Sequence, residues 1–90
     1  MIIGVAGLGT MGLGIVQTYA QAGFSVLATD ANGPARDSAL ARLATALAPR
    51  VAKGAMTDEA RDALLARVTV IGNADQFAPA ALIIEAIVER

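Results

Sequence analysis

The sequence predicts an α/β domain with a parallel sheet, and three observations lead to this fold class. Short apolar runs of strand length alternate with longer stretches in which apolar residues recur every three or four positions. A turn rich in glycine joins the first run to the first of these stretches. The 90 residues are 56% hydrophobic but only 3% aromatic, so we expect a core of Ala, Val, Ile and Leu. This length suffices for one small domain.

Residues 1–30 predict a strand, a helix and a second strand. Residues 1–6 form an apolar run without a polar face, which is typical of a buried parallel strand. Gly23 suits the left-handed position after a helix, and the apolar run over 24–29 predicts the second strand. The helix fits residues 11–22, where four apolar side chains share one face: Ile15, Val16, Tyr19 and Ala20. These elements together have the size of one βαβ unit.

The middle of the chain, about residues 34–66, predicts a helical hairpin. Asn32 or Gly33 can cap its first helix, and the first turn of that helix accepts Pro34. Pro49 lacks a backbone N–H, so we expect a kink or a break there. Apolar residues recur along this helix at steps of three and four: Leu40, Leu43, Leu47 and Val51.

A second helix and two further strands are predicted after this. Thr57 is a suitable N-cap for the helix, and Asp58 and Glu59 favour the positive end of its dipole. Residues 67–71 and 81–84 are apolar enough to form a third and a fourth strand. In a sheet ordered 3-2-1-4, the short link between them leaves room for little more than one helical turn.

The turn after the first strand matches the pattern G-x-G-x-x-G with the residues Gly7, Leu8, Gly9, Thr10, Met11 and Gly12. An acidic residue, Asp30, stands at the end of the second strand. Together these features are the fingerprint of a Rossmann-type dinucleotide site. Gly7 permits the tight turn, Gly9 lets the backbone approach a pyrophosphate, and Gly12 lets helix and strand pack closely. The expected fold is therefore a Rossmann-type parallel sheet.

The glycine turn and Asp30 are candidate contacts for NAD. Free N–H groups at the start of a helix attract phosphates, and the helix dipole adds to this attraction. Asp30 would accept hydrogen bonds from the adenine ribose, and its carboxylate would repel a 2′-phosphate, which favours NAD over NADP. Met11 is expected to pack under the cofactor. The alternative interpretation is a turn that binds no ligand, followed by an ordinary loop aspartate.

Composition disfavours several other classes of function. The chain has neither cysteine nor histidine, so it lacks the commonest general base, and we expect no metal site. A net charge of −1 gives no reason to expect nucleic-acid binding. Residues 1–29 carry no charge, but their six glycines and the lack of a basic start argue against a membrane segment or a secretory signal. We therefore expect a cytoplasmic location without membrane association.

Three stretches of the chain resemble one enzyme family. They are GLGTMGLGIVQTYAQAGFSVLATD, the hairpin SALARLATALAPRVAKGAMTDEARDALLARV, and LIIEAIVER at the fourth strand. Together they look like the start of the 3-hydroxyacyl-CoA dehydrogenases, which include the 3-hydroxybutyryl-CoA dehydrogenases. The likeness covers the whole chain. It implies an NAD-dependent enzyme that interconverts 3-hydroxyacyl-CoA and 3-oxoacyl-CoA.

The resemblance also implies roles for individual residues. The loop over residues 7–12 would bind the NAD pyrophosphate, and Glu89 would lie beside the cofactor near its nicotinamide end. The hairpin would help to hold CoA, and Lys53 matches a family lysine that contacts CoA. A family serine corresponds here to Ala46. Residues 36–53 carry four basic side chains and one acidic side chain, which suits the phosphates of CoA but also an ordinary solvated helix face.

The same resemblance implies what residues 1–90 lack. The family's catalytic histidine–glutamate pair lies beyond the position where this chain stops, so we expect no catalytic residue within it. The chain corresponds to the N-terminal part of an NAD-binding Rossmann domain: an incomplete sheet of about four strands, with the helical hairpin inserted between strands 2 and 3. A C-terminal catalytic and dimerisation domain is expected to be absent. The parent enzyme is expected to be a homodimer.

Two other functions stay open at this point. A free-standing regulatory module that binds NAD(H) without catalysis would share the glycine turn and Asp30. The group of 3-hydroxyisobutyrate and 6-phosphogluconate dehydrogenases also begins with G-L-G-x-M-G. That group commonly carries Asn-Arg after the second strand, where this chain has Asp30 and Ala31, and it lacks the long hairpin. Both differences favour the 3-hydroxyacyl-CoA dehydrogenases.

Overall fold

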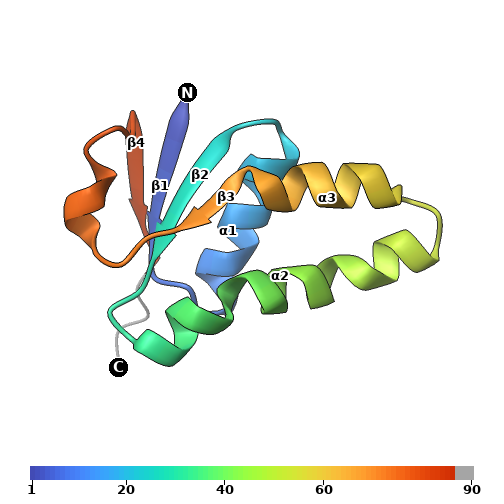
Figure 1. The fold of residues 1–90 in the computed structure, drawn as a ribbon, viewed down its shortest axis with the longest axis horizontal. Coiled ribbons are helices and arrows are strands. Elements are labelled where there is room, and N and C mark those ends of the chain that lie inside the picture. Colours follow the sequence, from blue (N-terminus) through green and yellow to red (C-terminus); the bar gives the residue numbers. More distant parts are fainter. Residues whose placement is uncertain (87–90) are drawn as a thin grey trace.

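Four parallel strands form a single sheet in the order β3-β2-β1-β4 (Figure 1). The computed structural model describes residues 1–86. The order is the predicted one, and each strand agrees with its predicted run to within two residues at either end. The strands are β1 (Ile2–Ala6), β2 (Ser25–Thr29), β3 (Val68–Val70) and β4 (Leu82–Glu85). The carboxyl ends of these parallel strands meet at one edge of the sheet, where ligands of such folds bind.

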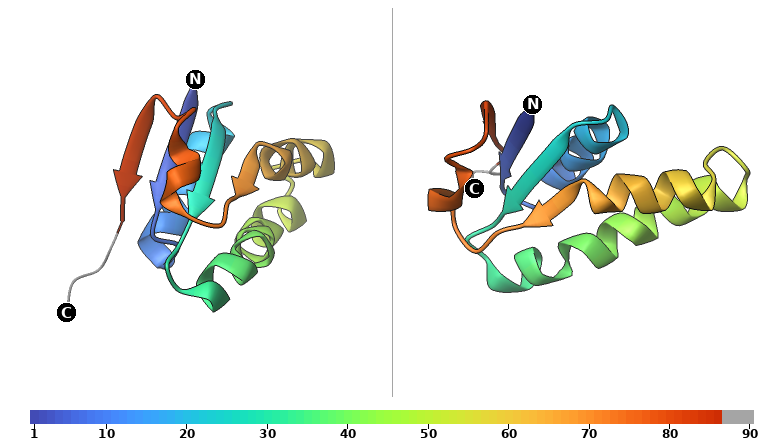
Figure 2. Two further views of the ribbon diagram at one scale, coloured as in Figure 1. Left: turned by 60° about the vertical axis from the view of Figure 1, so that its left-hand side comes forward. Right: turned by 45° about the horizontal axis from the view of Figure 1, so that its top comes forward.

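The two faces of the sheet are covered by different elements. Ile3 and Val5 of β1 are fully buried on the face that packs against α1 (Thr10–Gln21). Gly4 lies between them and points to the other face, where a Cβ atom would come within 3.0 Å of the Phe77 ring. Phe77 belongs to η1 (Ala74–Phe77), the short helical turn predicted between the third and fourth strands. Figure 2 shows this turn on the opposite side of the sheet from α1.

The two helices α2 (Gly33–Ala52) and α3 (Asp58–Ala66) form an antiparallel hairpin that projects past β3 (Figure 1). Both N-caps are those predicted. The Asn32 side chain accepts a hydrogen bond from Ala35 N–H at 2.9 Å, and the Thr57 side chain accepts one from Ala60 N–H at 3.0 Å. Leu43 and Leu47 are fully buried and anchor the hairpin on the core. Across residues 1–86, every helix is too short or too polar to cross a lipid bilayer.

Of the kink or break expected at Pro49, the break is wrong, because α2 continues through this residue to Ala52. Pro49 lacks the N–H whose partner in this helix would be the Thr45 carbonyl, and its ring crowds the same carbonyl. Pro49 stands in the last turn, so few residues have to continue the helix after it. Its own carbonyl still accepts a hydrogen bond from Lys53 N–H at 3.1 Å, which closes that turn. Packing of the helix on the core therefore outweighs the missing hydrogen bond.

Candidate cofactor site

The glycine turn joins the end of β1 to the start of α1 and is attached to β2. Gly7 has a φ of +100°, a left-handed conformation that side chains other than glycine rarely adopt. Its N–H donates to the Thr29 carbonyl at 2.9 Å, so the turn begins against the last residue of β2. The tight turn that the sequence predicts at Gly7 is confirmed.

Two further glycines of the motif have opposite surroundings. A Cβ atom on Gly12 would lie 1.7 Å from the Gly7 carbonyl oxygen, so no larger residue fits between the helix and the turn. The predicted close packing at Gly12 is therefore confirmed. A Cβ atom on Gly9 would meet nothing within 4 Å among residues 1–86. Gly9 therefore leaves open space in front of the first turn of α1, where N–H groups are free to bind an anion.

Asp30 is hydrogen-bonded to the glycine turn and also lies at the candidate cofactor site. Its Oδ2 accepts a hydrogen bond from Leu8 N–H at 2.7 Å, and its Oδ1 accepts one from Asn32 N–H at 2.8 Å. The bond from Leu8, then that from Asn32, and the nearby charges of Arg42 and Arg36 hold the pKa of Asp30 below its ordinary value. Burial raises this pKa but does not reverse the direction. Asp30 is thus ionised, and each oxygen keeps a lone pair for a further donor.

A cavity of about 350 Å³ opens at the carboxyl edge of the sheet beside Asp30. This volume is within the range of small-molecule sites. Most of the lining side chains are small and apolar, so a flat ring of a ligand could pack against them. Among residues 1–86, Thr29 Oγ1 is the buried side-chain polar atom that lacks a hydrogen-bond partner. The lining consists of Ala6, Gly7, Thr29, Asp30, Ala31, Gly72, Asn73 and Ala74.

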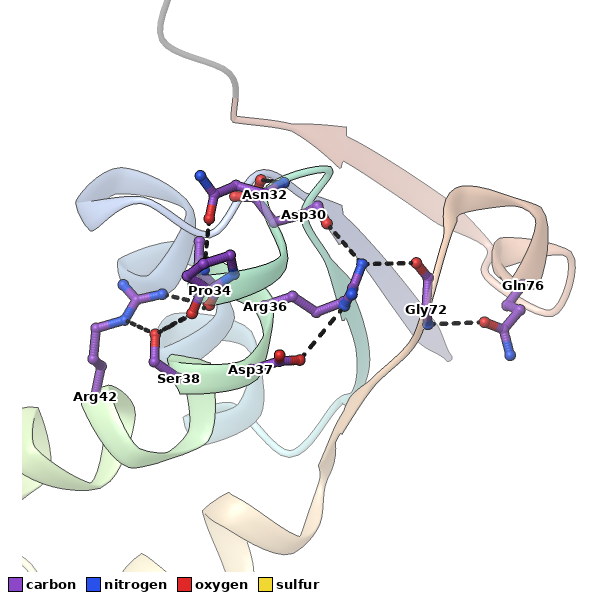
Figure 3. Close-up of polar contacts among 10 residues, drawn as sticks. Asp30, Asn32, Pro34, Arg36, Asp37, Ser38, Arg42, Gly72 and Gln76 are labelled. Atoms are coloured by element: carbon purple, nitrogen blue, oxygen red, sulfur yellow. Dashed lines mark hydrogen bonds and ion pairs between the residues drawn. The ribbon is translucent and has the colours of Figure 1, made fainter.

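Two arginines of α2, whose side chains are drawn in Figure 3, donate to backbone carbonyls at the strand ends and in the glycine turn. Arg36 Nη1 donates to the carbonyls of Asp30 at 3.4 Å and of Gly72 at 3.2 Å, which links the ends of β2 and β3. Arg42 Nη2 donates to the Leu8 carbonyl at 2.8 Å, inside the glycine turn. The sequence suggests that the basic residues of α2 serve CoA. Instead, both arginines donate to backbone carbonyls, and Arg42 also lines a groove between α1 and α2.

The remaining basic residues of α2 lie toward its far end. Arg50 Nη1 donates to the Gln21 side chain on α1 at 2.9 Å. Lys53, at the C-cap of α2, is exposed, and no hydrogen bond or ion pair joins its side chain to another of residues 1–86. Lys53 is therefore the basic side chain of this group that is available to a ligand.

The other residues predicted to bind the cofactor differ in how far their side chains are exposed. The Leu8 side chain is fully buried, so Leu8 contributes to the site through its backbone. Thr10 and Met11 are exposed at the start of α1, where Met11 presents 56% of its surface. Glu89 lies outside the described residues.

Sequence reasoning missed Thr29, Arg36 and Arg42 as parts of the site. Thr29 directly precedes Asp30 in the sequence, and this position was the available signal. For the two arginines, nothing in the sequence indicates that their side chains reach the glycine turn and the ends of the strands. Helical side chains lean toward the N-terminus, but which carbonyls they reach depends on the tertiary structure.

Comparison with known proteins identifies the family. The family model described as "3-hydroxyacyl-CoA dehydrogenase, NAD binding domain" matches residues 2–90. The chain belongs to the 3-hydroxyacyl-CoA dehydrogenase family. This assignment decides between the two dehydrogenase groups that share the G-L-G-x-M-G start. Family members act on acyl-CoA substrates, and the matching domain is the one that binds NAD in 3-hydroxyacyl-CoA dehydrogenases.

Individual 3-hydroxyacyl-CoA dehydrogenases match along almost the whole chain. A 3-hydroxybutyryl-CoA dehydrogenase of Bradyrhizobium diazoefficiens is 36% identical over 88 residues, which cover 98% of this chain and 30% of that protein. A probable 3-hydroxybutyryl-CoA dehydrogenase of Bacillus subtilis is 39% identical over 86 residues, 96% of this chain and 30% of that protein. The crystal structure of 3-hydroxybutyryl-CoA dehydrogenase from Escherichia coli matches with a TM-score of 0.92 at 34% identity, over 100% of this chain and 19% of that one. The chain thus spans less than a third of the length of these relatives.

Proposed function

We propose that residues 1–90 are the NAD-binding part of a 3-hydroxyacyl-CoA dehydrogenase, an enzyme that interconverts 3-hydroxyacyl-CoA and 3-oxoacyl-CoA. One observation carries the proposal: the ionised Asp30 is bonded to the glycine turn beside a cavity, and Gly9 leaves the start of α1 open. A turn without a ligand would need neither the open space nor the cavity.

The residues present fit NAD part by part. The pyrophosphate would lie on the free N–H groups of Gly9, Thr10 and Met11, where the dipole of α1 favours negative charge. Asp30 would accept hydrogen bonds from the adenine ribose hydroxyls, and its negative charge disfavours the 2′-phosphate of NADP. The adenosine would occupy the cavity lined by small side chains. NAD, when bound, supplies the acceptor for a hydride.

The roles of Glu89 and Lys53 are part of the same proposal. The family resemblance implies that Glu89 lies beside the nicotinamide end of the cofactor. Lys53 would contact a phosphate of CoA. Ala46, the position that corresponds to the family serine, lines a groove between α1 and α2 together with Arg42 and Gln17. Seven residues make about two helical turns, so Ala46 and Lys53 share one face of α2.

A single substitution in the glycine turn tests the NAD site. Gly9→Ala places a methyl group in the open space without touching any of residues 1–86, so the chain should fold normally. The methyl group should keep the pyrophosphate from the backbone and weaken NAD binding at least about tenfold, measured by calorimetric titration. Gly14→Ala is the matched control, because its Cβ also meets nothing within 4 Å but lies further along α1. If Gly9→Ala binds NAD as tightly as Gly14→Ala does, the proposed pyrophosphate site is wrong.

A further inference from the structure

We propose that Arg42 is a positioning residue for the dinucleotide: it orients the Leu8–Gly9 peptide so that Gly9 N–H faces the pyrophosphate. The inference rests on the proposed NAD site. It assigns to a side chain of the hairpin a function in cofactor binding, although the hairpin was expected to serve the acyl-CoA substrate.

The Arg42 guanidinium is held in one place by three hydrogen bonds. Its Nη2 donates to the Leu8 carbonyl and to the Ala35 carbonyl, both at 2.8 Å, and its Nε donates to Ser38 Oγ at 3.0 Å (Figure 3 draws the bond to Ser38). Ala35 and Ser38 belong to the first turns of α2. The arginine is therefore a fixed connection between the start of the hairpin and the glycine turn.

Both backbone polar groups of Leu8, in the glycine turn, are hydrogen-bonded. Leu8 N–H donates to the Asp30 carboxylate at 2.7 Å, and the Leu8 carbonyl accepts from Arg42 at 2.8 Å. The Leu8 side chain is fully buried in the core. With its N–H, its carbonyl and its side chain all engaged, Leu8 cannot rotate either of its two peptide groups without losing a contact.

Because the peptide group is planar, the hydrogen bond to the Leu8 carbonyl also sets the direction of Gly9 N–H. In a trans peptide the carbonyl and the following N–H point in opposite directions. Because Arg42 draws the Leu8 carbonyl toward α2, Gly9 N–H points away from α2. No hydrogen bond joins Gly9 N–H to another of residues 1–86. The donor is thus held ready at the turn where the pyrophosphate is proposed to bind.

In this proposal Arg42 acts through the backbone. Nη2 gives both of its hydrogens to carbonyl oxygens and Nε gives its hydrogen to Ser38, so of the five donors only the two hydrogens of Nη1 are not used in this way. Loss of the guanidinium would leave the Leu8–Gly9 peptide free to turn, while the cavity beside Asp30 stays intact. The expected defect is therefore selective: it affects ligands with a pyrophosphate and spares the nucleoside.

Arg42→Met tests this by comparing two probes, ADP-ribose and adenosine, in heteronuclear NMR titrations of the chain. We expect ADP-ribose binding to weaken about tenfold, as for the loss of one hydrogen bond to a charged group, with adenosine binding unchanged. In the unmodified chain the Gly9 amide signal should shift strongly with ADP-ribose but not with adenosine. In Arg42→Met this shift should be lost or greatly reduced.

Arg36→Met is the matched control, because it removes the same charge from the same helix but leaves the Leu8–Gly9 peptide bonded. It should preserve the Gly9 shift, and any loss of affinity should affect both probes. If Arg42→Met binds ADP-ribose normally, or loses adenosine to the same degree, Arg42 has no positioning role. If the unmodified chain binds neither probe, the proposed NAD site itself fails.

Discussion

At the scale of a single residue, Asp30 stabilises the glycine turn and is proposed to bind the ribose, and both roles require its negative charge. Each carboxylate oxygen accepts a backbone N–H, one from the glycine turn and one from the start of α2. A neutral side chain of the same shape cannot replace this, because an asparagine has one accepting oxygen and an NH₂ group that would face the other donor. The residue that is proposed to recognise the ribose thus also fixes the turn that is proposed to bind the pyrophosphate.

Asp30→Asn should therefore destabilise the chain in a pH-dependent way. The folded-state pKa of Asp30 lies below its ordinary value of 3.8, so the ionised form stabilises the fold above that pH. This contribution is lost as pH falls through the lowered pKa. We expect a loss of about 1–3 kcal/mol in the free energy of unfolding at neutral pH, measured with urea, and a smaller loss as pH falls below the ordinary value of 3.8. Asp37→Asn is the control, since the Asp37 side chain is 79% exposed and should matter little. A loss that does not change with pH would contradict the role of the charge.

At the scale of elements, the two prolines of α2 have opposite effects on the same helix. Pro34 stands in the first turn, where its missing N–H would have no helical partner and its fixed φ suits the helix. Pro49 stands inside the last turn and removes a hydrogen bond that the helix could otherwise form. The position within the element, and not the residue type alone, decides what a proline costs.

Replacing each proline with alanine should separate these effects. Pro49→Ala restores an N–H and should raise the free energy of unfolding by about 1–3 kcal/mol. Pro34→Ala restores nothing and makes the unfolded chain more flexible, so it should lower stability by about 0.5–1 kcal/mol. Urea denaturation of the two variants measures both changes. Pro49 would have no net cost to the helix if Pro49→Ala were no more stable than the unmodified chain.

Element types could be predicted because they depend on local patterns, and strand order because the glycine fingerprint indicates a doubly wound sheet. Gly23 and Thr57 mark helix ends by their own backbone or side-chain chemistry, and the strands are continuous apolar runs. The continuation of α2 past Pro49 could not be predicted, because it depends on how the helix packs against the rest of the core. The same holds for the candidate site. The glycines and Asp30 follow from spacing, whereas Arg42 and Thr29 acquire their surroundings only when distant segments meet.

At the scale of the whole molecule, α2 connects two candidate ligand sites. Through Arg36 its N-terminal half binds the Asp30 and Gly72 carbonyls beside the cavity, and through Arg42 it binds the glycine turn. Its C-cap carries the exposed Lys53. A helix of 20 residues is about 30 Å long, so the two ends lie well beyond the reach of screened charge interactions at physiological salt. Binding at one end should therefore be separable from binding at the other.

Two variants should show this separation. Lys53→Glu reverses a charge at the proposed CoA phosphate contact and should weaken CoA binding about threefold to tenfold, while NAD binding stays unchanged. Gly9→Ala should weaken NAD and leave CoA unaffected. Calorimetric titration of each variant with each ligand measures all four affinities. The effect of Lys53→Glu should shrink as salt is raised, because Lys53 is exposed and its charge is screened. If Lys53→Glu weakened both ligands equally, Lys53 would affect the fold as a whole, and the proposed contact with CoA would be wrong.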